Sequence, residues 1–322
     1  MSEPTMTDPD RIIDVFDARV RRREDRRDFF KLFAGGAGLA AGGAALSLAP
    51  RAAQAATIGD PDILNFALNL EYLEAQFYSY AATGSGLPNS MLTGTGTQGT
   101  VIGGHQVNFS DPVVAAYAKE IAADEVAHVN FLRQALGNSA VAMPSIDVGG
   151  TDPNGAFSSA ARAAGLVGAG VAFDPYANDE NFLLGAFVFE DVGVTAYKGA
   201  APLITSTTYL QAAAGILAVE AYHASLIRST LYAKGVQTPS LRTSADAISA
   251  ARDSLDGPTT DDEGISGTST TANIAPLDSN GIAFSRTTGQ VLNIVYLNHL
   301  SINKGGFFPA GVNGTINTSA AN

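Results

Sequence analysis

The sequence predicts an all-α protein built on a four-helix bundle with one long crossover. Four long stretches carry apolar residues at three- and four-residue spacing and are rich in Ala, Leu and Phe, which is typical of amphipathic helices. A long connection, residues 138–177, separates the first two stretches from the last two. Two helix pairs joined by one long crossover are the topology of a four-helix bundle.

Local signals set the ends of these four helices. The first two are each expected to begin at a capping residue followed by proline, which is favoured in the first helical turn. The third is expected to begin at an Asn-Asp pair and the fourth at a serine. The expected helices run from Gly59 to about Ala82, from Ser110 to Gly137, from about Asn178 to Gly199, and from about Ser206 to just before Gly235.

The remaining segments are expected to cover the bundle. Residues 83–109 are dense in Gly, Thr, Ser and Asn and predict a surface loop, and a short helix is expected near Ser158 to Leu166. We divide the mature chain into a bundle, residues 56–235, and a C-terminal extension, residues 236–322, packed on it. Within the extension, residues 257–275 read as a loop, a short fifth helix is expected at Gly289 to Leu297, and Phe307-Phe308-Pro309 is expected to pack on the bundle.

Residues 1–55 are interpreted as a signal peptide of the twin-arginine type. Arg26-Arg27-Asp28-Phe29-Phe30-Lys31 precedes a weakly apolar run from Leu32 to Leu48, and Ala53-Gln54-Ala55 places small residues where a signal peptidase cleaves. This interpretation predicts a periplasmic or extracellular protein without stable membrane insertion after cleavage. A basic helix with a Gly/Ala-rich tail, or an uncleaved anchor, are the alternatives.

Composition limits the chemistry of any bound metal. The 322 residues include no cysteine, so thiolate ligands and disulfides are excluded, and a metal must be held by oxygen and imidazole nitrogen. These donors suit iron, manganese or zinc. The formal net charge is -12 and no basic block lies outside the N-terminus, which argues against nucleic-acid binding.

Acidic residues interrupt the apolar faces of all four helices. Glu71 and Glu190 lie among Ala, Leu, Phe and Val, where an uncompensated carboxylate would cost several kcal/mol to bury. Glu125-Val126-Ala127-His128 and Glu220-Ala221-Tyr222-His223 each place a glutamate and a histidine one helical turn apart, so that both can reach a common ion.

The order of these residues is more specific than any single pair. The chain has only four histidines, and two of them follow a glutamate by three residues on helices that are expected to be buried. The order Glu, Glu-x-x-His, Glu, Glu-x-x-His follows the four helices and matches the ligand set of a two-metal carboxylate site in a bundle core. We therefore prefer a metal site of Glu71, Glu125, His128, Glu190, Glu220 and His223 to a structural network of ion pairs.

Several neighbouring residues are assigned other roles. Tyr78 and Tyr197 follow Glu71 and Glu190 by seven residues, a repeat that indicates two copies of one helix pair. We expect these tyrosines to be packing residues with a satisfied hydroxyl, rather than hydrogen-bond donors to metal ligands or radical sources. We expect Asp124 and Asp191 to point away from the site, solvated or capped, and His105 and His299 to lie on the surface or in loops: none of these four is a candidate ligand.

Two motifs resemble a known family. Phe189-Glu190-Asp191-Val192-Gly193-Val194-Thr195-Ala196-Tyr197 and Phe307-Phe308-Pro309-Ala310-Gly311 are similar to the ferritin-like superfamily, and within it to exported ferritin-like proteins grouped with plant desiccation-related proteins. The resemblance spans residues 57–313. It implies bridging roles for Glu125 and Glu220, terminal roles for Glu71 and Glu190, and one metal each for His128 and His223. Glu74 remains an alternative to Glu71.

Such a site predicts redox chemistry on dioxygen or peroxide. We expect two metal ions, iron preferred and manganese as the alternative, that oxidise Fe(II) or remove peroxide in stress protection. The alternatives are a dimanganese catalase-like enzyme and a non-catalytic, metal-stabilised structural or desiccation-protective protein. Long loops and the C-terminal extension favour a small assembly, such as a homodimer, over a storage cage.

Overall fold

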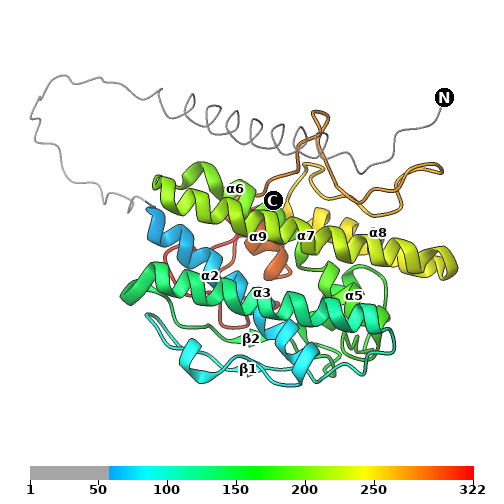
Figure 1. The fold of residues 1–322 in the computed structure, drawn as a ribbon, viewed down its shortest axis with the longest axis horizontal. Coiled ribbons are helices and arrows are strands. Elements are labelled where there is room, and N and C mark those ends of the chain that lie inside the picture. Colours follow the sequence, from blue (N-terminus) through cyan, green and yellow to red (C-terminus); the bar gives the residue numbers. More distant parts are fainter. Residues whose placement is uncertain (1–57) are drawn as a thin grey trace, which may run out of the picture. The chain divides into compact units, whose positions relative to one another are not determined.

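The computed structural model describes residues 58–322, which fold as an all-α unit (Figure 1). The expected signal peptide, residues 1–55, lies outside the described residues. In chain order the elements are α2 (Asp60–Thr83), η1 (Asn89–Met91), β1 (Val101–Ile102), α3 (Pro112–Leu136), η2 (Gly137–Ser139), β2 (Ile146–Asp147), α4 (Ala156–Ala163), α5 (Asp179–Phe187), α6 (Glu190–Ala200), η3 (Ala201–Leu203), α7 (Thr207–Gln237), α8 (Pro239–Asp256) and α9 (Thr288–Val295).

The four-helix bundle is formed by α2, α3, the α5–α6 pair and α7, as the sequence predicts. α2 packs on α3, α6 packs on α7, and α2 meets α6 across the middle of the bundle. The helix ends follow their capping residues. The Asp111 carboxylate accepts a hydrogen bond from the backbone N–H of Val113 at 2.9 Å, and Gly84 ends α2 in the left-handed conformation (φ 77°) that favours glycine.

The third helix differs from the continuous helix that was expected. It breaks at Val188–Phe189 and resumes as α6 at Glu190. The guanidinium of Arg252, from α8, donates hydrogen bonds to the carbonyl oxygens of Phe187 and Val188, which the break leaves without helical partners. The break therefore places a candidate ligand, Glu190, in the first turn of a new helix.

Among the described residues, α7 is the one helix with the length and apolar composition of a membrane-spanning segment. Length and composition alone are weak evidence for a membrane span, and 28% of the apolar window of α7 is buried in the fold. α7 packs on α5, α6 and α8, and it buries Glu220, His223 and Arg228 against them. The buried face of α7 thus supplies polar groups to the interior of the bundle.

The C-terminal extension holds a helix that was not expected. α8 begins directly after α7, with Thr238 as its N-cap and Pro239 in its first turn, and packs on α4, α5, α7 and α9. The short fifth helix is present as α9, close to its expected range. Phe307 and Phe308 are fully buried, and the Phe307 ring meets that of Phe189 edge-on with centroids 4.9 Å apart. The aromatic segment therefore packs inside the fold.

The long loops lie along the α2–α3 side of the bundle (Figure 1). β1 and β2 come from the two loops and pair in parallel, with Val101 opposite Ile146. The expected short helix in the crossover is α4, displaced by about two residues toward the N-terminus from its expected range. These contacts hold the two long connections against each other.

Candidate metal centre

Four helices bring the six predicted ligands to one place in the bundle core. α2 supplies Glu71, α3 supplies the Glu125 pair, α6 supplies Glu190 and α7 supplies the Glu220 pair. All six side chains are buried among apolar residues of these helices: Glu71, Glu125, His128, Glu190, Glu220 and His223. The structure thus brings together every residue of the set that the sequence pattern predicts.

One half of the centre gathers around His128. Its Nδ1 lies 3.2 Å from Glu71 Oε2, 3.4 Å from Glu125 Oε2 and 3.9 Å from Glu220 Oε1. One donor atom from each of these four residues lies within 4.8 Å of the others. This spacing allows all four to ligate a single ion.

The other half gathers around His223. Its Nδ1 lies 3.0 Å from Glu125 Oε1 and 3.6 Å from Glu190 Oε2, and the two imidazole rings are 6.5 Å apart between centroids. Glu125 therefore turns one carboxylate oxygen toward each histidine. That is the arrangement of a carboxylate that bridges two ions.

Several ligand atoms of the centre lack hydrogen-bond partners. Both carboxylate oxygens of Glu125 and of Glu220, Oε2 of Glu190 and Nδ1 of His223 are buried without a hydrogen bond. Buried polar atoms are ordinarily paired, and an unpaired ionised carboxylate is costly. Cations placed among these atoms would satisfy them, so the residues present fit a metal centre.

Burial and mutual contacts shift the pKa values of these groups. Burial and the neighbouring Glu125 raise the pKa of Glu71 to about 7, and burial raises that of Glu190 to about 8. Burial opposes ionisation of Glu125 too, but contacts with both imidazoles prevail and lower its pKa to about 2. Although burial disfavours the imidazolium, the surrounding carboxylates raise the pKa of His128 to about 11 and of His223 to about 9.

Two tyrosine hydroxyls each donate a hydrogen bond to a candidate ligand on the other helix pair. The Tyr78 hydroxyl on α2 donates to Glu190 Oε1 on α6, and the Tyr197 hydroxyl on α6 donates to Glu71 Oε1 on α2. The expectation that they serve mainly as packing residues is therefore wrong, because each hydroxyl orients a candidate ligand. This reciprocal pairing reflects the internal repeat, in which a tyrosine follows each glutamate by seven residues on the same helix.

Two aspartates next to the candidate ligands also differ from expectation. Asp124 Oδ2 lies 3.2 Å from His223 Nε2, on the side of the ring opposite Glu125, so it helps to orient that imidazole. Asp191 points away from the centre as expected, but it is buried and pairs with Arg228 and Arg252 instead of with solvent. His105 is exposed in a loop, as expected.

The two alternatives on α2 lie in different surroundings. Glu71 contacts His128, whereas neither imidazole of the centre lies within 4 Å of Glu74. Glu74 is nevertheless buried, and burial together with the carboxylates of Glu125 and Glu190 raises its pKa well above the usual value. The geometry favours Glu71 as the ligand and leaves Glu74 as a buried acid beside the centre.

A glycine makes room for one candidate bridging carboxylate. A Cβ atom on Gly193 would lie 2.2 Å from Glu220 Oε2, far inside van der Waals contact. Gly193 stands one turn after Glu190 on α6, so the backbone of this helix approaches Glu220 directly. The position requires a residue without a side chain if Glu220 is to keep its place.

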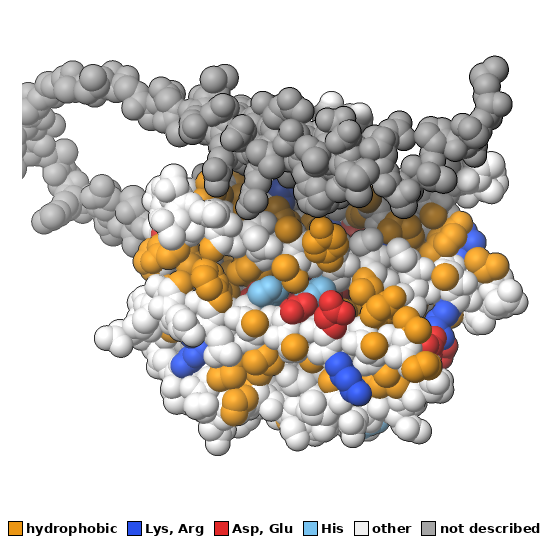
Figure 2. Space-filling model, in the orientation of Figure 1, with side chains coloured by type: hydrophobic (Ala, Val, Ile, Leu, Met, Phe, Trp, Pro, Cys, Tyr) orange, Lys and Arg blue, Asp and Glu red, His pale blue; other side chains and the backbone are white. Residues whose placement is uncertain are grey.

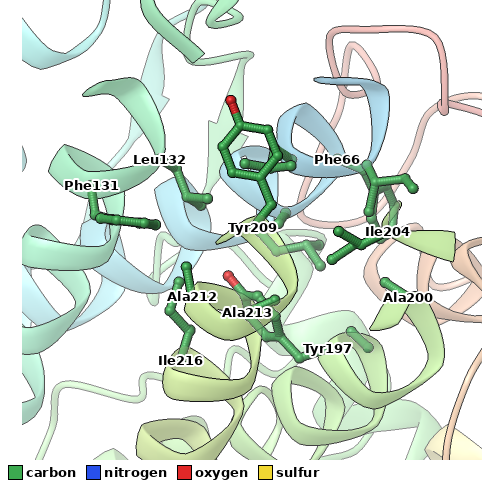
Figure 3. A pocket seen from close by; sticks show the side chains of 15 residues that line it. Phe66, Phe131, Leu132, Tyr197, Ala200, Ile204, Tyr209, Ala212, Ala213 and Ile216 are labelled. Carbon is green, nitrogen blue, oxygen red and sulfur yellow. The ribbon is translucent and has the colours of Figure 1, made fainter. Parts of the chain in front are cut away.

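The centre lies close to one face of the molecule and next to an apolar pocket. Figure 2 shows histidine atoms beside acidic side chains between α3 and α7, and the His128 side chain is 10% exposed. The pocket lies between α2, α3, α6 and α7, and Tyr197 is in its wall together with Phe66, Phe131, Ile204 and Tyr209 (Figure 3). A neutral molecule such as dioxygen is compatible with this lining.

The fold and the converging carboxylates define a ferritin-like protein. A family model described as a ferritin-like domain matches residues 59–233, which contain all six candidate ligands. The match covers more than half of the chain, so the chain belongs to the ferritin-like domain family. The resemblance seen in the sequence motifs is thereby confirmed.

Two curated relatives are similar to this chain. The chain is 28% identical over 273 residues to the ferritin-like catalase Nec2 of Nesocodon mauritianus, an alignment that covers 80% of this chain and 84% of that protein. It is 33% identical over 177 residues to the desiccation-related protein PCC13-62 of Craterostigma plantagineum, covering 54% of this chain and 53% of the relative. No solved structure matches.

Proposed function

We propose that the centre holds two metal ions and converts hydrogen peroxide into water and dioxygen. The observation that carries this proposal is the set of buried donor atoms without hydrogen-bond partners on Glu125, Glu190, Glu220 and His223. We infer two ions because the donors form two groups, one around each histidine. The relative named a ferritin-like catalase, which aligns over most of its length, supports peroxide as the substrate.

The side chains divide naturally between two ions. Glu71 and His128 would hold one, Glu190 and His223 the other, and Glu125 and Glu220 would bridge them. Oxygen and imidazole donors suit iron or manganese, and we prefer iron. When bound, the pair of ions would supply the two-electron change that peroxide disproportionation requires. The protein's part is to orient the ligands through Tyr78, Tyr197 and Asp124 and to enclose them in an apolar core.

Oxygen evolution from peroxide tests this proposal directly. The protein is reconstituted with Fe(II) or Mn(II), freed of excess metal, and assayed with an oxygen electrode. The double variant Glu125→Ala/Glu220→Ala should lose both the metal and the activity. A matched control, Glu120→Ala/Glu180→Ala, removes two acidic side chains outside the centre and should retain both. Oxygen evolution that survives in the Glu125→Ala/Glu220→Ala variant would refute the assignment.

Two other outcomes would redirect the proposal. Fe(II) consumption under dioxygen without oxygen release from peroxide would make the protein an Fe(II) oxidase built on the same centre. Stoichiometric metal without turnover in either assay would favour a structural, desiccation-protective role, which is the class named for the second relative. Each result is read from the same purified sample.

We propose in addition that the protein is exported through the twin-arginine pathway and matures at Ala56. The motif Arg26-Arg27 and the small residues Ala53-Gln54-Ala55 support this location. Mass spectrometry of the protein from the periplasmic or extracellular fraction should find Ala56 at its N-terminus. An Arg26→Lys/Arg27→Lys variant should remain in the cytoplasm with its full length.

A further inference from the structure

A second cluster of acidic groups lies at the end of α8, apart from the bundle centre. Asp253 and Asp256 occupy the last turn of this helix, and Asp261 follows in the next loop. One carboxylate oxygen from each lies within 4.8 Å of the others. The backbone N–H of Asp261 also donates to Asp253 Oδ1 at 3.3 Å, which folds the loop back onto the helix.

One oxygen of this cluster is buried without a partner. Asp256 is 1% exposed, and its Oδ2 accepts a hydrogen bond from Arg286 Nε at 2.5 Å. Its Oδ1 is buried and has no hydrogen bond. Asp261 is also buried, whereas Asp253 is partly open to solvent. The cluster therefore has an unsatisfied interior oxygen and an open side through which an ion could enter.

The cationic residues around the cluster do not balance its charge. Arg286 pairs with Asp256 and Asp262 and lies 3.4 Å from Asp261, while Arg252 pairs with Asp262. Four carboxyl groups, those of Asp253, Asp256, Asp261 and Asp262, thus face two guanidinium groups, so full ionisation of the cluster leaves two negative charges without a cationic partner. The farther pair, Asp191 with Arg228, is neutral and leaves this surplus unchanged.

We propose that Asp253, Asp256 and Asp261 bind one calcium ion. All three donors are carboxylate oxygens, which hard divalent cations prefer, and the ion would offset the two surplus charges. Oxygens within 4.8 Å of one another can share one ion at the roughly 2.3–2.6 Å that is typical of Ca²⁺. Mg²⁺ demands near-ideal octahedral geometry and gives up its waters reluctantly, so a site of three carboxylates suits Ca²⁺ better. The C-terminal end of a helix also favours a cation.

The ion would connect the extension to the bundle. It would join the end of α8 to the loop that carries Asp262, which binds Arg252 and Arg286. Arg252 in turn donates to the carbonyl oxygens at the break before α6. Calcium would thus stabilise the C-terminal extension, and it would do so independently of any turnover at the bundle centre.

Calcium titration of the full protein tests this inference. Protein that retains its centre's metal is dialysed into calcium-free buffer and titrated by calorimetry, with thermal unfolding followed in parallel. The expected result is one Ca²⁺ per chain, a higher Tm with Ca²⁺, weaker or no binding of Mg²⁺, and no release of the metal in the centre. No heat and no Tm shift at millimolar Ca²⁺, or tighter binding of Mg²⁺, would overturn the proposal.

Substitutions locate the site. The double variant Asp253→Asn/Asp261→Asn should weaken Ca²⁺ binding at least tenfold, and the single variant Asp253→Asn, at the open side, provides the same test with the smallest disturbance of folding. Asp152→Asn/Asp278→Asn is the matched control. Asp152 is exposed and Asp278 is half-buried, and both cap turns elsewhere through oxygens that asparagine keeps. Equal Ca²⁺ affinity in Asp253→Asn and in the control would contradict the assignment.

Discussion

At the residue scale, the centre depends on groups that do not themselves contact a metal. The hydroxyls of Tyr78 and Tyr197 each hold the carboxylate of the opposite helix pair, and Asp124 contacts His223 from the outer side. Partners of this kind fix the orientation of ligands and typically change metal affinity or activity by about 10–100-fold when they are removed.

Replacing either tyrosine by phenylalanine should therefore weaken the centre while the fold persists. Tyr78→Phe frees Glu190 Oε1 and Tyr197→Phe frees Glu71 Oε1, so each variant should bind metal or turn over peroxide about 10–100-fold less well. Tyr176→Phe is the control, since its buried hydroxyl donates to the carbonyl oxygen of Val148. It should cost about 1 kcal/mol of stability and leave the metal content unchanged.

Gly193→Ala tests how closely α6 approaches Glu220. The added methyl group would lie 2.2 Å from Glu220 Oε2, so the carboxylate must move away from the centre. We expect metal occupancy to fall, as measured by metal analysis after dialysis, with circular dichroism unchanged because alanine is a good helix former. Gly215→Ala on α7, where a Cβ would meet nothing within 4 Å, should leave occupancy intact. Full occupancy in Gly193→Ala would show that Glu220 is not held as described.

At the scale of elements, the break in the third helix is the feature that positions Glu190. A guanidinium from α8 caps the carbonyl groups at the break, pairs with Asp191 and Asp262, and stacks 4.7 Å from the Phe187 ring centroid. The C-terminal extension thereby supports the candidate metal centre, although it contributes none of the six candidate ligands.

Arg252→Met should destabilise the whole fold. It leaves two buried carboxylates without this partner, and breaking a buried ion pair typically costs about 3–5 kcal/mol. Denaturant unfolding should register a loss of this order, and metal affinity should fall with it because Glu190 follows the break. Arg242→Met on the same helix, at a partly buried position, should cost less. A loss for Arg252→Met no larger than for Arg242→Met would rule out this role for the extension.

The sequence predicts the elements well where the decisive signals are local. Gly59, Asp111 and Ser206 are capping residues, and the observed helices begin immediately after them. The break at Val188–Phe189 could not be predicted, because the apolar pattern continues through it. The group that binds the free carbonyl oxygens, the Arg252 guanidinium, comes from a helix that is distant in the sequence. α8 did leave a signal in the buried positions Leu241, Ala245, Ile248 and Arg252, but the last of these is charged and weakens the apolar pattern.

The candidate ligands could be predicted for a physical reason. The charge of a glutamate on an apolar helix face must be compensated when the helix is buried. Glu71 and Glu190 can therefore be identified as candidate ligands without any knowledge of the fold. The contacts of Asp124 and Asp191 could not be predicted in the same way, because both depend on which side of the helix faces a neighbouring element. The tyrosine repeat indicated that the two helix pairs are related. It did not indicate that each hydroxyl would donate to the glutamate of the other helix pair.

At the scale of the whole molecule, the centre couples metal binding and stability to pH. In the metal-free fold the pKa values of Glu71 and Glu190 are raised to about 7 and 8, above the usual 4.5, and that of His223 is raised to about 9. The folded chain then binds more protons than the unfolded chain, so its free energy of unfolding should fall as the pH rises from about 5 to 9.

Metal binding should follow the opposite trend. The ligands must lose these protons to bind an ion, so the apparent Kd should fall by about tenfold per pH unit for each proton released. Thermal unfolding from pH 5 to 9 should therefore show a Tm difference between metal-loaded and metal-free protein that widens with pH. A difference that is constant or shrinks over this range would mean that the protonated groups are not the ligands.

The location of bound metal tests the central claim most directly. Anomalous diffraction from crystals of iron- or manganese-loaded protein should show two peaks about 3.5–4 Å apart in the bundle core. Glu125 and Glu220 should lie between the peaks, with His128 on one ion and His223 on the other. A single ion, or two ions that Glu125 does not touch, would contradict the two-metal centre on which the proposed function rests.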